Sequence, residues 1–111
     1  MSRIAAISIL GFAAALEAGG DAIIRLGLHT HSVSRRIALF LLAALVLFAY
    51  GWSVNTPPWD FGKLLGLYVV FFLLFAQVLS WIMFRQPPSP SIIVGGILIV
   101  AGGLVISLGK V

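Results

Sequence analysis

The sequence contains no cysteine and very little charge. Only 3 of its 111 residues are acidic and 7 are Lys or Arg, so charged residues make up 9% of the chain. Soluble domains carry about 25% charged residues, whereas 61% of this chain is hydrophobic. The composition therefore predicts an integral membrane protein. The absence of cysteine excludes disulfides and thiolate metal sites, and the few basic residues form no dense run, which argues against nucleic acid as a partner.

The motifs of the common enzyme chemistries are missing as well. The chain has no phosphate-binding loop, no Rossmann fingerprint and no plausible base beside its serines. His29 and His31 lie two positions apart, so they do not share a helix face, and no carboxylate or cysteine accompanies them. We therefore expect no metal site, no cofactor and no enzymatic activity.

Four apolar segments are long enough to cross a bilayer, which takes about 20 helical residues. They cover residues 4–28, 37–54, 64–84 and 92–108. The breaks between them are short, and two contain Pro-Pro pairs, which end helices because proline has no amide hydrogen. The sequence therefore predicts an all-α fold, a single membrane domain over residues 1–111 that forms a bundle of four transmembrane helices. The short breaks also predict that consecutive helices lie antiparallel and adjacent.

The charges at the segment ends do not fix the orientation of this bundle. Three basic residues fall on the side of the termini and four on the other side. The two groups are Arg3, Lys63 and Lys110, and Arg25, Arg35, Arg36 and Arg85. This difference is too small for the positive-inside rule to act on. The chain therefore has either one fixed orientation or dual topology, with copies inserted both ways.

Glu17 stands near the middle of the first apolar segment, with Asp21 one helical turn on and Arg25 one turn further. An ionisable group at the bilayer centre costs at least about 2–3 kcal/mol, so such residues usually serve a function. The spacing favours an Asp21–Arg25 ion pair and leaves Glu17 deeper and less compensated. Desolvation and the nearby anion then favour the protonated carboxyl, as suits a proton carrier or a cation site. The alternative is a static polar cluster that joins helices.

Glycine dominates the last segment. Gly95 and Gly102 lie seven residues apart, as do Gly96 and Gly103. This spacing keeps glycines on one helix face, where another backbone can approach closely. We predict that these four glycines pack against a second copy of the chain; the alternative is packing within one monomer. Tyr68, at the start of the third segment, is either an interfacial aromatic or a site residue whose hydroxyl has a partner.

Together these features resemble the small multidrug resistance transporters. The likeness covers nearly the whole chain and includes the midspan Glu17. The stretch that begins Ser80-Trp81 and continues through Gln86, Pro90, Ile92-Ile93 and Gly95 to Ala101-Gly102 is similar to that family's third loop and last span. Features similar to its YnfA-like branch are Glu17-Ala18-Gly19-Gly20, Tyr50-Gly51 and Asp60-Phe61-Gly62-Lys63.

The resemblance implies a homodimer, antiparallel in that family, in the bacterial inner membrane. It implies that two membrane glutamates face a shared cavity and exchange protons for small organic cations or guanidinium-type substrates. Glu17 would be that carboxylate, and Tyr68 falls where the family places a cavity aromatic. Asp21 and Arg25 are additions to the family pattern. We assign Asp21 to the same substrate- and proton-binding site and Arg25 to a structural role as its charge partner.

The third segment departs from the family pattern. Its small, glycine-rich hinge is replaced here by Val69-Val70-Phe71-Phe72. Bulky side chains at this position favour an alternative function, that of a non-transporting accessory or assembly subunit whose partners are other membrane subunits of a larger complex. The midspan Glu17 favours the transporter.

Overall fold

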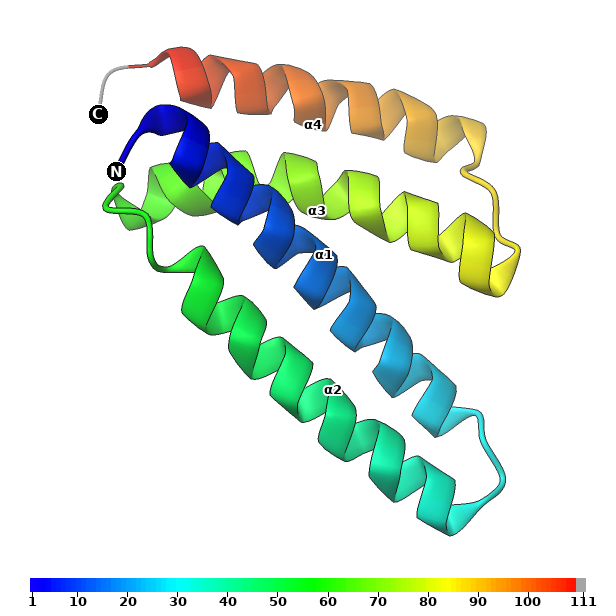
Figure 1. The fold of residues 1–111 in the computed structure, drawn as a ribbon. Coiled ribbons are helices and arrows are strands. Elements are labelled where there is room, and N and C mark those ends of the chain that lie inside the picture. Colours follow the sequence, from blue (N-terminus) through cyan, green and yellow to red (C-terminus); the bar gives the residue numbers. More distant parts are fainter. Residues whose placement is uncertain (110–111) are drawn as a thin grey trace.

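The computed structural model describes residues 1–109, and within that range the chain forms four helices and no strand. The helices are α1 (Arg3–Leu28), α2 (Val33–Val54), α3 (Phe61–Phe84) and α4 (Pro90–Leu108). All four are long and apolar enough to cross a membrane, which confirms the predicted all-α bundle. The chain runs up and down, so the N-terminus and the end of α4 lie at the same end of the molecule (Figure 1).

Each helix ends where the sequence predicts, but each begins one to four residues earlier. Hydrophobicity marks where the bilayer starts, whereas a helix starts where its first amide groups find an acceptor. Ser2, Ser32 and Ser89 supply that acceptor, because each hydroxyl accepts a hydrogen bond from the backbone amide three residues further on. Pro90 occupies the first turn of α4, where its missing amide hydrogen costs nothing.

Helix α1 is the centre of the bundle. Eight of its residues are buried, against two each in α2 and α3 and one in α4. It packs against both α2 and α3, while α4 packs against α3. The predicted adjacency of consecutive helices is therefore correct for α1 and α2 and for α3 and α4, but wrong for α2 and α3. These two helices spread apart from their connecting turn, and α1 lies between them over most of its length (Figure 1).

Small side chains allow α1 to contact two helices at once. Its buried small residues include a seven-residue repeat, Ala6, Ala13, Gly20 and Gly27. A Cβ atom added at Gly20 would lie 2.5 Å from Leu47 Cδ2. Glycine at this position therefore sets how closely α2 approaches α1.

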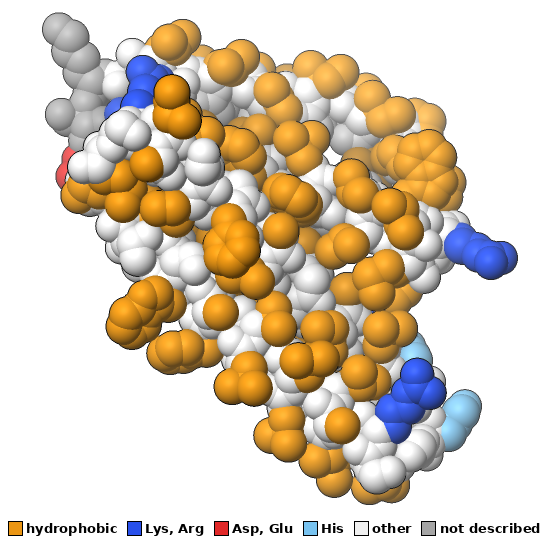
Figure 2. Space-filling model, viewed as in Figure 1, with side chains coloured by type: hydrophobic (Ala, Val, Ile, Leu, Met, Phe, Trp, Pro, Cys, Tyr) orange, Lys and Arg blue, Asp and Glu red, His pale blue; other side chains and the backbone are white. Residues whose placement is uncertain are grey.

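The surface matches a bilayer environment. Figure 2 shows apolar side chains along the whole length of one face, with basic and histidine side chains only towards its ends. The up-and-down path places Arg3 and Lys63 at the end of the N-terminus, and Arg25, Arg35 and Arg85 at the opposite end. Lys110, which the orientation count includes, lies outside the described residues. The two ends fit the headgroup regions of a membrane.

Leucine substitutions at two adjacent glycines test the α1–α2 contact. We expect Gly20→Leu to lower the free energy of unfolding by about 1–3 kcal/mol, because the new side chain collides with Leu47. Gly19→Leu is the matched control, since a Cβ atom there meets nothing within 4 Å. The measurement is unfolding of the purified protein in mixed micelles of increasing dodecyl sulfate content. Equal stability of the two variants would contradict this packing.

Candidate functional site

Glu17 and Tyr68 form the central polar contact of the bundle. The Tyr68 hydroxyl donates a hydrogen bond of 2.7 Å to Glu17 Oε1 and lies 3.4 Å from the carbonyl oxygen of Ala13. A hydroxyl has one hydrogen, and the shorter bond, to the carboxylate, is the stronger one. The two residues are 51 positions apart in the sequence, so this bond also ties α1 to α3.

The local sequence explains why the Tyr68 side chain fits between the helices. Ala13 and Ala14 are 0% exposed and belong to the same buried cluster as Tyr68, which is 4% exposed. Their small side chains leave room on α1 for an aromatic ring from α3. The ring of Tyr50, from α2, lies 5.6 Å from the Tyr68 ring between centroids. Side chains of three helices therefore hold the Tyr68 hydroxyl in place.

Glu17 lies at the edge of this cluster rather than within it. The residue is only half-buried, although it stands near the middle of a membrane-spanning helix. Its carboxylate accepts one side-chain hydrogen bond, from the Tyr68 hydroxyl, and its second oxygen has lone pairs for a further donor or a cation. The geometry suits reversible exchange of one positively charged species for another at this carboxylate.

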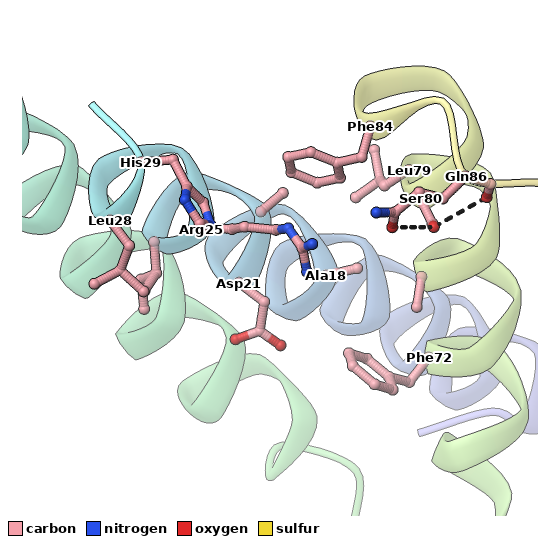
Figure 3. A pocket seen from close by; sticks show the side chains of 13 residues that line it. Ala18, Asp21, Arg25, Leu28, His29, Phe72, Leu79, Ser80, Phe84 and Gln86 are labelled. Atoms are coloured by element: carbon pink, nitrogen blue, oxygen red, sulfur yellow. Dashed lines mark hydrogen bonds between the residues drawn. The ribbon is translucent and has the colours of Figure 1, made fainter. Parts of the chain in front are cut away.

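The sequence predicts an ion pair between Asp21 and Arg25, but the structure does not contain it. The Arg25 guanidinium lies over the Phe84 ring, 5.1 Å from the ring centroid. The side chain extends across from α1 toward α3, whereas Asp21 projects in a different direction (Figure 3). Among residues 1–109 no ion pair joins the two side chains. The physical reason is that Phe84 offers the cation an aromatic face across the helix pair.

Both residues line a groove between α1 and α3, at the end where the helix pairs spread apart (Figure 3). The groove has a volume of about 450 Å³. Its polar lining consists of Asp21, Arg25, His29, Ser80 and Gln86. Phe72, whose ring stacks on Tyr68, lines the inner part of the groove, whereas Glu17 and Tyr68 themselves do not line it.

The four predicted packing glycines of α4 divide into two pairs. A Cβ atom at Gly96 would lie 3.3 Å from Leu73, and one at Gly103 would collide with Val70, so both face α3 of the same chain. Gly95 and Gly102 have nothing within 4 Å of a Cβ position. Packing within the monomer therefore accounts for Gly96 and Gly103, and Gly95 and Gly102 form an open strip.

Sequence reasoning missed three aromatic residues of this region. Tyr50 packs on Tyr68, Phe72 stacks on Tyr68 with 6.3 Å between ring centroids, and Phe84 lies under Arg25. Aromatic residues are so frequent in this chain, with eight Phe alone, that type and spacing do not single these three out. Tyr50, before Gly51, and Phe72, in the bulky stretch of the third segment, were noted in the sequence, but neither was predicted to contact Tyr68.

Within residues 1–109, no group of three or more His, Asp or Glu side chains is arranged to hold a metal ion. Comparisons of the chain with known protein families, with curated proteins and with solved structures find no match. The function is therefore inferred from the chemistry of the chain's own residues.

A double-mutant cycle tests the Glu17–Tyr68 bond. We expect Tyr68→Phe to lower the free energy of unfolding by about 1–3 kcal/mol, because the carboxylate loses its donor. In the Glu17→Ala background the same change should cost at least about 1 kcal/mol less. Unfolding in mixed dodecyl sulfate micelles measures all four proteins. Additive effects of the two substitutions would show that the bond does not contribute to stability.

Proposed function

We propose that this integral membrane protein is a transporter of the small multidrug resistance type, which exports small cationic compounds in exchange for protons. The observation that carries the proposal is Glu17, a half-buried carboxylate near the middle of a membrane helix, bound by the Tyr68 hydroxyl. A static cluster that only joined helices would bury its charges and pair them with one another. Glu17 is instead half-buried and has no ion pair among the described residues, and the nearest cation along α1, Arg25, lies over an aromatic ring.

The exchange at Glu17 is simple in chemical terms. An arriving cation is stabilised by the charged carboxylate, so the carboxyl gives up its proton as the cation binds. When the cation leaves, a proton takes its place on the carboxylate. Tyr68 donates to the same oxygen in the charged state, so it holds the carboxylate in one position between the two events.

The proposal includes a homodimer, because one chain does not enclose Glu17. The groove beside Glu17 lies between α1 and α3 and is open at one side of the monomer. A second copy would close it and supply a second Glu17. The open strip of Gly95 and Gly102 on α4 offers a surface of the kind that membrane helices use for close contact. An antiparallel arrangement fits the nearly balanced basic residues at the two ends, and the bacterial inner membrane remains the proposed location.

One observation favours the second candidate, an accessory subunit of a larger membrane complex. Residues 69–72 are bulky and lie inside the unbroken helix α3. Val70 also fills the space over Gly103 of α4. This close contact between α3 and α4 favours an accessory subunit, because a transport cycle requires a helix that bends or shifts. If the protein is an accessory subunit, Gly95 and Gly102 would contact another membrane subunit.

Transport in liposomes tests the role of Glu17. With an acidic lumen, we expect the wild-type protein to accumulate radiolabelled guanidinium or tetraethylammonium, because protons leave as cations enter. Glu17→Gln should lower this uptake at least about 100-fold, because the amide keeps the shape of the side chain but does not bind and release a proton. Asp60→Asn is the matched control, since Asp60 precedes α3 at the membrane edge. Wild-type levels of uptake by a folded Glu17→Gln protein would exclude Glu17 as the exchange site, and no uptake by the wild type would favour the accessory subunit.

Leucine substitutions at two adjacent glycines of α4 distinguish an effect on self-association from an effect on folding. We expect Gly102→Leu to shift the purified protein from dimer to monomer without lowering its stability, because Gly102 faces open space. Gly103→Leu should instead lower stability by about 1–3 kcal/mol, since it collides with Val70. Light scattering in maltoside detergent measures the oligomer, and dodecyl sulfate unfolding measures stability. An unchanged dimer in Gly102→Leu would place the interface elsewhere.

A further inference from the structure

The groove between α1 and α3 is lined by two residues of opposite charge that form no ion pair with each other. Asp21 and Arg25 are one helical turn apart, which is about 6 Å along the axis, and both line the groove. Both residues are exposed, and Arg25 rests on Phe84. Asp21 lies one turn deeper than Arg25 and has no ion pair among the described residues, and an acidic group inside a membrane helix without a cation beside it is costly. A ligand that brings one charge of each sign would compensate both residues at once.

The walls of the groove suit a small ligand with separated charges. Its volume of about 450 Å³ is within the usual range for small-molecule sites. Phe72 and Phe84 provide aromatic surfaces on the α3 side. Ser80 and Gln86 line the outer part, where the Ser80 hydroxyl donates to the Gln86 carbonyl oxygen at 3.1 Å and so holds the turn after α3 in place (Figure 3).

The groove also has a direction. Its inner end points toward the level of Glu17, because Phe72 lines it and stacks on Tyr68, the hydrogen-bond donor of Glu17. Carboxylates therefore lie toward the middle of the bundle, and the basic residues Arg25 and His29 lie toward the membrane edge. A ligand bound along the groove would place its cationic end inward and its anionic end outward.

We propose that this groove binds zwitterionic ligands, with an ammonium or guanidinium group at Asp21 and a carboxylate or phosphate group at Arg25. This inference rests on the proposed function, because it names the substrate class that enters the same path. It differs from recognition of simple cations in one respect. Arg25 repels a simple cation, whereas it forms charge-assisted hydrogen bonds with the anionic end of a zwitterion. Ligands of this chemistry are free amino compounds with an acidic group and the phosphoethanolamine headgroup of lipids.

Three small probes of similar length test the proposal by titration calorimetry on the purified protein in maltoside detergent. They are phosphoethanolamine, ethylammonium and ethyl phosphate. We expect phosphoethanolamine to bind at least about tenfold more tightly than either of the others, the size of effect that one additional charge-assisted contact gives. Equal affinity for phosphoethanolamine and ethylammonium, or no detectable binding of phosphoethanolamine, would overturn the proposal.

Variants of Asp21 and Arg25 test which residue binds the cationic end of the ligand and which binds the anionic end. Arg25→Gln should reduce phosphoethanolamine binding to the level of ethylammonium, while Arg25→Lys should keep the preference. Asp21→Asn should weaken binding of both amines about tenfold or more. Arg35→Gln is the matched control, because Arg35 lies at the same end of the bundle but does not line the groove. An unchanged preference in folded Arg25→Gln protein would overturn the assignment.

Nanodiscs distinguish the two sources of the ligand. If the occupant is a lipid headgroup, discs that contain phosphatidylethanolamine should abolish binding of soluble phosphoethanolamine, whereas discs of phosphatidylglycerol alone should not. If the occupant is a free compound, both discs should leave binding intact. Equal loss of binding in both discs would mean that Arg25 binds any anionic headgroup, which would overturn the proposal that the groove selects zwitterionic ligands. Because these are binding measurements, absence of proton-coupled transport would remove the proposed function without affecting them.

Discussion

The position of α1 between two other helices is the constraint on which the rest of the structure depends. A bilayer gives helices little hydrophobic reason to associate, since lipid tails are as apolar as leucine, so close packing has to hold them together. The small residues of α1 make that packing possible on two faces. Gly20 and Gly27 admit side chains of α2, and Ala13 and Ala14 leave space for the Tyr68 ring of α3. Because α1 is the shared helix, the one acidic residue near its middle, Glu17, lies where side chains of three helices meet.

The electrostatics of the site follow from this arrangement. Glu17 receives a strong donor, the buried Tyr68 hydroxyl, because its helix is pressed against α3 at that level. One turn further on, α1 and α3 have already separated, and the gap between them becomes the groove that Asp21 and Arg25 line. Arg25 reaches across that gap to Phe84. The spreading of the two helix pairs therefore produces both the accessible carboxylate and the unpaired charges beside it.

Helix α4 combines two properties that bear on function. One glycine pair, Gly96 and Gly103, fastens it to α3, and the neighbouring pair, Gly95 and Gly102, is open. The first pair receives side chains of α3, Leu73 and Val70, and the second pair has no neighbour within the described part of the chain. An accessory subunit needs only these two properties. A transporter needs in addition that α3 and α4 move together as one unit against α1 and α2, and the spread between the two helix pairs in Figure 1 is compatible with such a motion.

The sequence alone determined the membrane class, the number of helices and the last residue of every helix, because apolar length and proline are local properties of the chain. It also singled out Glu17, since a charge within an apolar run stands out without any knowledge of its neighbours. Only the tertiary structure decided what each group contacts. Helical spacing favoured an ion pair between Asp21 and Arg25, but the guanidinium found an aromatic ring on α3. The glycine repeat of α4 did not reveal which pair faces α3, because the rotation of a helix about its axis is set by the helix it packs against. The sequence left open whether Tyr68 is an interfacial aromatic or a residue whose hydroxyl has a partner, and only the packing around small α1 residues placed that hydroxyl 2.7 Å from a carboxylate 51 positions away.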